Sequence, residues 1–121
     1  LTVGENEVVL LDMEAGVEHF GRGVDNSVDL ILMIVDPSFE SLKLTKKIQQ
    51  LGESIGKTVF FVLNKVNGQI LPTMLESIDD QSKVLAVISE DTEIARKGLL
   101  GNELMMEIPE IHTLAREILK Q

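Results

Sequence analysis

The chain has 121 residues, 44% of them hydrophobic, which suits a single domain with a packed core. Twenty acidic against 11 basic residues give a net charge of −9, which disfavours nucleic acid and anionic membrane surfaces and leaves proteins or small ligands as partners. Cysteine is absent, which excludes disulfides and thiol chemistry within these residues, and the 3% of aromatic residues disfavours base stacking. Nothing resembles a signal peptide or a membrane span, so we expect a cytoplasmic protein.

Four short apolar runs, rich in β-branched residues, predict buried strands. They are residues 8–11, 30–35, 59–63 and 84–88. Because the runs lack polar alternation, both faces of each strand should be covered, which is typical of parallel sheets in α/β proteins. The expected fold is therefore α/β, a mainly parallel sheet of about four strands flanked by helices.

The first two predicted helices lie on either side of the third run. From Phe39 to Ile55, apolar residues recur at steps of three and four, and Gly56 is placed to end this helix. Pro72 is typical of a first helical turn and marks a shorter helix before the fourth run.

Two further helices are predicted after the fourth strand. Asp91 is a candidate N-cap for a helix over residues 92–97, which Gly98 can end. Pro109 opens a last helix, whose apolar residues share one face. No repeat or linker interrupts the chain, so residues 1–121 are interpreted as part of one domain with right-handed crossovers.

The first predicted strand ends in Asp12, with Gly16 one turn further on. Ligands of open α/β sheets bind at the carboxyl ends of the strands. An aspartate there can hold Mg²⁺ or its water, while a glycine amide approaches a terminal phosphate. The alternative is that Asp12 only caps a loop.

The third strand runs into Asn64, Lys65, Val66 and Asn67, a relative of the NKxD sequence that reads guanine. A carboxylate at the last position would accept two hydrogen bonds from guanine, whereas the amide of Asn67 offers one acceptor and one donor group. The residues therefore favour adenine, read by Asn64. Alternatively, Asn64 only turns the chain at the end of the strand.

Residues 52–58 resemble a phosphate-binding loop but have three residues between the glycines, where that motif requires four. The segment also ends a helix and opens a strand, which is the reverse of the order that points helix amides at phosphates. We therefore interpret it as an ordinary turn.

Residues 18–23 combine Glu18, His19 and Arg22 with two glycines. Such a loop suits a nucleotide-sensing switch or a partner surface, although its charged groups are also typical of a solvated loop. No serine, histidine and acid set has a convincing spacing, so no catalytic residue and no metal ligand is assigned within the chain.

Several of these segments together resemble a known family. Residues 11–23 (LDMEAGVEHFGRG), 35–38 (VDPS), 64–66 (NKV) and 88–91 (ISED) are similar to CooC-type carbon monoxide dehydrogenase maturation ATPases, within the MinD and ParA-like class of P-loop proteins. The resemblance implies the C-terminal half of a P-loop NTPase (Rossmann-like) domain without the phosphate-loop strand and its loop.

The resemblance also implies roles for individual residues. Asp12 would contact Mg²⁺ indirectly and Gly16 would sense the terminal phosphate, while Glu18, His19 and Arg22 lie in the switch-like loop. The residues implied in adenine binding are Asn64, Lys65, Ile88, Ser89, Glu90 and Asp91.

By the same resemblance, the parent protein is an ATPase that binds ATP or ADP with Mg²⁺ and assists nickel insertion into carbon monoxide dehydrogenase. Nickel would be held by a Cys-x-Cys pair that these residues do not contain. A homodimer or strand-exchanged oligomer is expected, and the chain alone is expected to be inactive because the phosphate loop supplies most of the positioning of the phosphates.

Two other functions fit parts of the pattern. One is a MinD or ParA-like positioning ATPase, but the last helix carries Glu110 and Glu117 beside its basic residues and is not the basic amphipathic helix that membrane attachment favours. The other is a free-standing receiver-like or flavodoxin-like module, in which Asp12 and Asp36 mark a phosphoacceptor site and Lys65 supplies the expected lysine.

Overall fold

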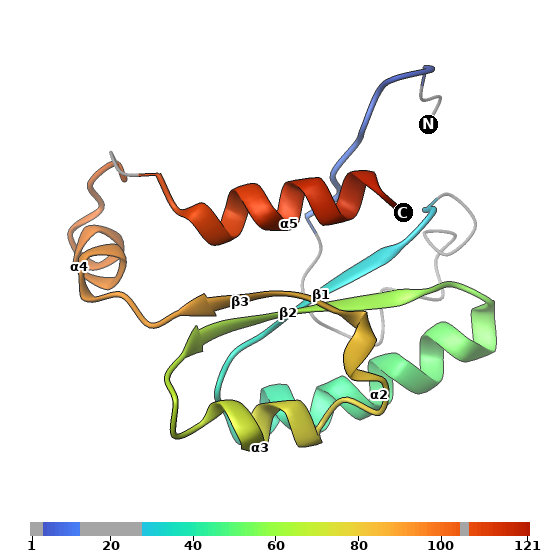
Figure 1. Cartoon of the computed structure of the whole chain (residues 1–121), viewed down its shortest axis with the longest axis horizontal. Coiled ribbons are helices and arrows are strands. Elements are labelled where there is room, and N and C mark those ends of the chain that lie inside the picture. Colours follow the sequence, from blue (N-terminus) through green and yellow to red (C-terminus); the bar gives the residue numbers. More distant parts are fainter. Residues whose placement is uncertain (1–3, 13–27, 105–106) are drawn as a thin grey trace.

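In the computed structural model, which describes residues 4–12, 28–104 and 107–121, three parallel strands form a sheet in the order β1-β2-β3 (Figure 1). The strands are β1 (Ile31–Val35), β2 (Val59–Val66) and β3 (Val84–Ser89). Helices α2 (Phe39–Ile55) and α3 (Leu71–Glu76) lie on one face, and α5 (Pro109–Leu119) lies on the other. The predicted α/β class with a parallel sheet is confirmed.

Each pair of neighbouring strands is joined by a helical crossover. Helix α2 connects β1 to β2, whose register runs from Ile31 beside Val59 to Val35 beside Leu63. Helix α3 and the short 3-10 helix η2 (Gln81–Lys83) connect β2 to β3. Because the strands are parallel, their carboxyl ends share one edge, and α4 (Thr92–Leu100) follows β3 at that edge (Figure 1).

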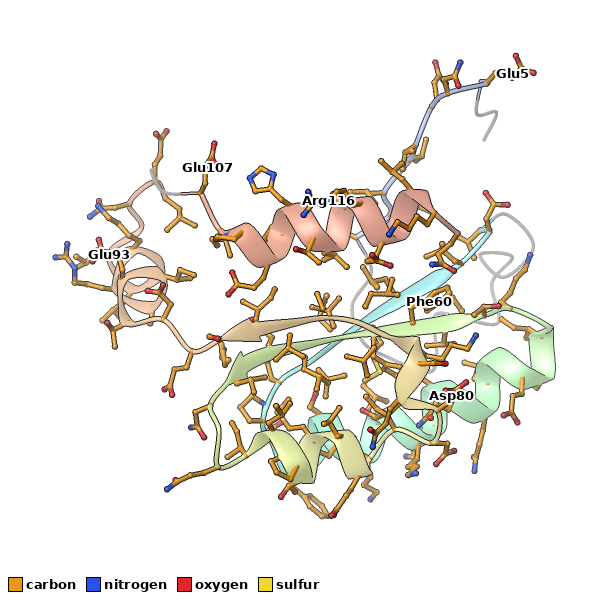
Figure 2. The ribbon with its side chains drawn as sticks, in the orientation of Figure 1. Glu5, Phe60, Asp80, Glu93, Glu107 and Arg116 are labelled. Carbon is orange, nitrogen blue, oxygen red and sulfur yellow. The ribbon has the colours of Figure 1, made fainter. Side chains whose placement is uncertain are left out.

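The middle strand, β2, supplies half of the buried hydrophobic residues. Phe61 and Leu63 are buried in a cluster with residues of α2 and α3, so this cluster fills the space between those helices and the sheet. Phe60 and Val62 alternate with them and are buried on the side of α5, where Figure 2 shows Phe60. Burying side chains of this size stabilises the fold by about 1.5–3 kcal/mol each.

Helix α2 begins and ends at residues suited to those places. The hydroxyl of Ser38 accepts a hydrogen bond from the Ser41 backbone N–H at 3.1 Å, which caps the N-terminus. At the other end Gly56 has a left-handed backbone with a φ of 70°. The prediction that Gly56 ends this helix is confirmed.

The later helices agree with the predictions at their starts and differ at one end. Pro72 and Pro109 stand in the first turns of α3 and α5, and Asp91 caps α4. Helix α4 does not end at Gly98, as predicted, but continues to Leu100. Gly101 adopts the left-handed conformation, and its N–H reaches the carbonyls of Gly98 and Lys97.

The prediction of a strand over residues 8–11 is wrong. This segment has no strand pairing among the described residues, and the side chains of Val8 and Leu10 are 62% and 81% exposed. An apolar run becomes a strand only when another strand pairs with its backbone, and the run itself does not encode that partner. The described sheet therefore has three strands rather than the four expected.

Candidate functional site

Polar side chains gather at the carboxyl edge of the sheet. Asp36 directly follows β1, Asn64 and Lys65 lie near the end of β2, and residues 88–91 run from the end of β3 into α4. This edge is where open α/β sheets bind their ligands.

A β-bulge places the two polar residues of β2. Leu63 lies beside Val87 and Val66 lies beside Ser89, so β2 advances three residues while β3 advances two. Within the bulge, Lys65 has a φ of 55°, which is unusual for a residue other than glycine. A bulge interrupts the alternation of a strand and redirects its side chains, and here it brings two consecutive polar residues to the sheet edge.

Asp36 connects β1 to both of these residues. Its carboxylate oxygen Oδ1 accepts a hydrogen bond of 3.0 Å from Asn64 Nδ2, and its Oδ2 lies 3.6 Å from Lys65 Nζ. The backbone N–H of Asp36 donates to the hydroxyl of Ser41 at 3.1 Å, which ties the aspartate to the first turn of α2. The side chains of Asp36 and Lys65 are 46% and 65% exposed, so the ion pair itself stabilises the fold by at most about 1 kcal/mol.

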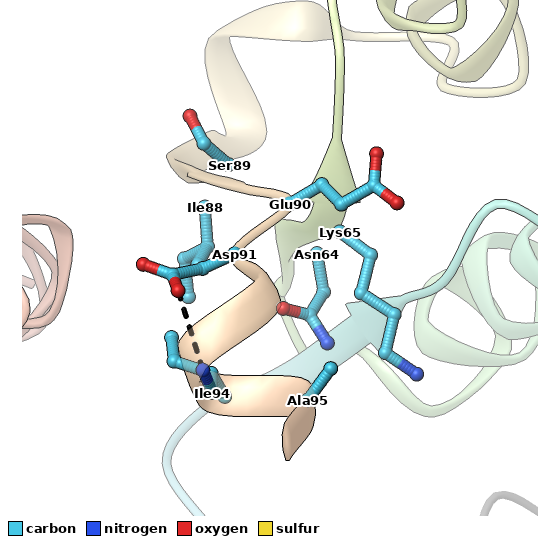
Figure 3. Close-up of a pocket in the computed structure, with 8 residues that line it drawn as sticks. All are labelled: Asn64, Lys65, Ile88, Ser89, Glu90, Asp91, Ile94 and Ala95. Atoms are coloured by element: carbon cyan, nitrogen blue, oxygen red, sulfur yellow. Dashed lines mark hydrogen bonds between the residues drawn. The ribbon is translucent and has the colours of Figure 1, made fainter. Parts of the chain in front are cut away.

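Beside this cluster lies a cavity of about 170 Å³ (Figure 3). Its lining combines polar groups of β2 and of the chain after β3 with apolar side chains of β3 and α4. The lining residues are Asn64, Lys65, Ile88, Ser89, Glu90, Asp91, Ile94 and Ala95.

The position of α4 beside the cavity depends on Asp91. Its Oδ1 accepts hydrogen bonds from the backbone N–H groups of Glu93 at 2.8 Å and Ile94 at 3.2 Å. The backbone N–H of Glu90 donates to the carbonyl of Val66 at 2.9 Å, which holds the start of this turn against β2. The apolar wall and the amide of Asn64 together suit a flat heterocycle that carries hydrogen-bonding groups on its edge.

All six residues assigned to adenine binding line this one cavity. Ile94 and Ala95 were not predicted to lie there. The available signal was Asp91 itself, because an N-cap fixes the residues three and four positions later in the first helical turn, next to the end of β3.

Of the remaining predicted site residues, the structure describes Asp12, which does not line the cavity. Asp12 is exposed and does not follow a strand, which corrects the expected position at a strand tip. Gly16, Glu18, His19 and Arg22 lie outside the described residues.

Asn67 does not line the cavity. Its Oδ1 accepts hydrogen bonds from the backbone N–H groups of Gln69 at 3.0 Å and Ile70 at 3.1 Å, just before α3. The side chain thus serves the turn between β2 and α3, as asparagine commonly does.

Within residues 4–12, 28–104 and 107–121, no three histidine or acidic side chains come together as a metal site. In the same part of the chain, every helix is too short or too polar to cross a membrane.

Comparison with known proteins gives relatives that match between 78% and 99% of this chain. An uncharacterized ATP-binding protein of Methanocaldococcus jannaschii is 44% identical over 99% of this chain and 48% of its own length. A second one from the same organism is 33% identical over 88% of this chain and 43% of its own length. The carbon monoxide dehydrogenase accessory protein CooC of Rhodospirillum rubrum is 37% identical over 78% of this chain and 36% of its own length. No protein-family model matches the chain.

The chain spans about half the length, or less, of the curated relatives it matches. Its three-stranded parallel sheet with helices on both faces is consistent with part of a P-loop NTPase domain. At these identities the chain is homologous to part of the Methanocaldococcus jannaschii ATP-binding proteins and, over 78% of its residues, to part of CooC.

Proposed function

We propose that the cavity beside Asn64 binds the adenine base of ATP, and that the chain is the base-binding part of an ATP-binding accessory protein for metallocentre maturation. The observation that carries this proposal is the meeting of two sequence motifs, residues 64–65 and 88–91, in one cavity at the carboxyl edge of the sheet. That edge is the usual ligand position in this class of fold.

The chemistry of the lining fits a purine. The amide of Asn64 can hydrogen-bond to polar atoms on the edge of a base, and the side chains of Ile88 and Ile94 offer apolar contact to its flat surface. Lys65 is 65% exposed and stands beside Asp36 at the rim, where its stem can cover part of the ligand while its ammonium group stays in water.

For the phosphates, we propose the contacts that the family resemblance implies. Asp12 would act on Mg²⁺ through its water, Gly16 would approach the terminal phosphate, and the loop with Glu18, His19 and Arg22 would respond to it. Bound Mg²⁺ would supply neutralisation of phosphate charge.

Nucleotide binding is tested with the full-length protein and its Asn64→Ala variant. Removal of a base-reading amide should weaken ATP binding by about tenfold, as expected for one lost hydrogen bond that leaves a buried polar group of the ligand unpaired. Asn102→Ala is the matched control, since Asn102 is exposed beyond the end of α4 and does not line the cavity. Equal ATP affinity in wild type and Asn64→Ala by isothermal titration calorimetry would remove the cavity from the nucleotide site.

The accessory role is the finer part of the proposal. It rests on the similarity to CooC, whose name makes it a carbon monoxide dehydrogenase accessory protein. We propose that the full-length protein acts as a homodimer or strand-exchanged oligomer, and that its client is carbon monoxide dehydrogenase, into which it assists nickel insertion.

Reconstitution tests this role. Metal-free carbon monoxide dehydrogenase is incubated with Ni²⁺, ATP and the full-length protein, and its activity is followed over time. The wild-type protein should accelerate activation, and Asn64→Ala should do so only at higher ATP concentration. Activation at the same rate with and without the protein would refute the accessory role while leaving nucleotide binding in place.

A further inference from the structure

We propose that Asp36 is a positioning residue that fixes the direction of the Asn64 amide, so that the cavity prefers a purine with an amino group at position 6 over one with a carbonyl there. The inference rests on the proposed function, because it assumes that the cavity holds a base. It adds a residue outside the lining of the cavity and a reason for the choice of base.

The direction of the amide follows from the chemistry of its partner. An ionised carboxylate can only accept hydrogen bonds, so the group that Asn64 turns toward Asp36 must be its NH₂, and the bond length is 3.0 Å. The amide oxygen then faces the opposite way. Figure 3 shows it on the side of Asp91 and Ile94, which both line the cavity.

Asp36 is itself held from two directions. Its backbone N–H donates to Ser41, and its second carboxylate oxygen lies 3.6 Å from Lys65 Nζ. The two carboxylate oxygens are thus shared between Asn64 and Lys65, and rotation of Asp36 away from Asn64 would also separate the ion pair. The acceptor of Asn64 is therefore presented to the cavity before a ligand arrives.

This arrangement separates the two kinds of purine. A 6-amino group donates to the amide oxygen of Asn64 and leaves its bond with Asp36 intact. A 6-oxo group needs a donor, and supplying one requires the amide to turn, which directs its oxygen at the Asp36 carboxylate. That exchange replaces a charge-assisted hydrogen bond with a repulsive contact, so the 6-oxo purine should bind at least about tenfold more weakly.

The experiment compares the dissociation constants of ATP and inosine triphosphate for the full-length protein. Inosine triphosphate keeps the ribose and phosphates of ATP and carries a carbonyl at position 6. Wild type should prefer ATP by at least about tenfold. In Asp36→Asn the new amide can either donate or accept, so Asn64 is free to turn, and the preference for ATP should fall by about tenfold, mainly through tighter binding of inosine triphosphate.

Asp79→Asn is the matched control. It also removes a carboxylate that pairs with a lysine, Lys46, but it lies after α3 and does not line the cavity. The preference for ATP should be unchanged in this variant. If Asp36→Asn fails to fold, as judged by its thermal transition, Asp36→Ser replaces it, because a hydroxyl can also both donate and accept.

A double-mutant cycle shows whether Asp36 acts through Asn64. In the Asn64→Ala background, Asp36→Asn should leave the ratio of the two dissociation constants unchanged. A ratio near one in wild type would overturn the inference and leave ATP binding standing. Equal weakening of both nucleotides by Asp36→Asn would also overturn it, since a merely structural role has that effect. Absence of ATP binding in wild type would refute the proposed function itself.

Discussion

Gly52 in helix α2 permits the close approach of that helix to the first residue of β2. It is buried, and a Cβ atom added there would lie 2.4 Å from Val59 Cγ2 and 3.0 Å from the backbone oxygen of Lys57. Alanine gains about 1 kcal/mol over glycine from helix propensity. Overpacking of this kind costs about 1–3 kcal/mol, and the upper part of that range applies because one of the two contacts is with backbone. Gly52→Ala should therefore destabilise the protein by about 1–2 kcal/mol.

Two further variants separate the clash from the helix effect. Gly98 lies within α4, and a Cβ there would meet open space, so Gly98→Ala should stabilise by about 0.5–1 kcal/mol. Val59→Ala removes the methyl group that Gly52→Ala would strike. The double variant Gly52→Ala/Val59→Ala should be more stable than the sum of the single effects predicts, by about 1 kcal/mol or more.

Urea unfolding followed by far-UV circular dichroism gives the free energies of unfolding of the wild type and of these four variants. A Gly52→Ala protein as stable as wild type would show that α2 does not lie this close to β2. A loss of stability that Val59→Ala does not relieve would show that the clash with Val59 is not its cause. The result also bears on the site, because β2 carries Asn64 and Lys65 toward its other end.

Three further predictions concern the edge that forms the site. Asp91→Ala should cost about 1 kcal/mol of stability, because it removes the N-terminal cap of α4. Asp91→Asn should be nearly neutral, since asparagine caps a helix equally well. Thermal unfolding of the two variants compares their stabilities. Asn67→Asp completes the guanine-reading sequence but should give no gain in GTP affinity, because the side chain at this position accepts two backbone hydrogen bonds before α3. Tighter GTP binding by this variant in a titration would contradict the placement of residue 67 outside the cavity. Lys65→Val should destabilise the protein by about 1–2 kcal/mol, because a β-branched residue is strained at a φ of 55°. Lys65→Gly should stay within about 1 kcal/mol of wild type. Equal stability of the two variants in urea would argue against the left-handed backbone at this position.

Elements whose causes are local were predictable from the sequence. Helix α2 follows from apolar spacing between Phe39 and Ile55 and from the glycine that ends it, and both ends are confirmed. The predicted end of α4 at Gly98 was wrong. Gly98 and Gly101 can both end a helix, and the left-handed conformation that ends α4 occurs at Gly101. Composition does not distinguish two such candidates three residues apart.

Elements that depend on distant partners were not predictable. The apolar run at residues 8–11 resembles a strand, but strand pairing needs a second segment. In the described parts of the chain no segment pairs with this run. Strand β2 was expected to end at Leu63, where the apolar run stops. It continues to Val66 because backbone hydrogen bonds do not require apolar side chains and a bulge accommodates the polar pair.

The site shows the same division. The cavity residues of β2 and of the β3 end were found because each motif is contiguous, and the parallel sheet places strand ends at one edge. The contact between Asp36 and Asn64 was missed because these residues are 28 positions apart in the sequence. Their distance in space depends on the register of β1 with β2, which a single sequence does not contain.

The bulge in β2 has an entropic consequence for any ligand. Leu63 and Val66, on either side of Asn64 and Lys65, are both buried, so the backbone of the polar pair is held at both ends. Ordering the backbone of one residue costs about 1–2 kcal/mol, and here folding has already met that cost. A ligand that enters the cavity meets two residues whose backbone is already ordered, and more of its contact energy remains as affinity than at a site on a loose loop.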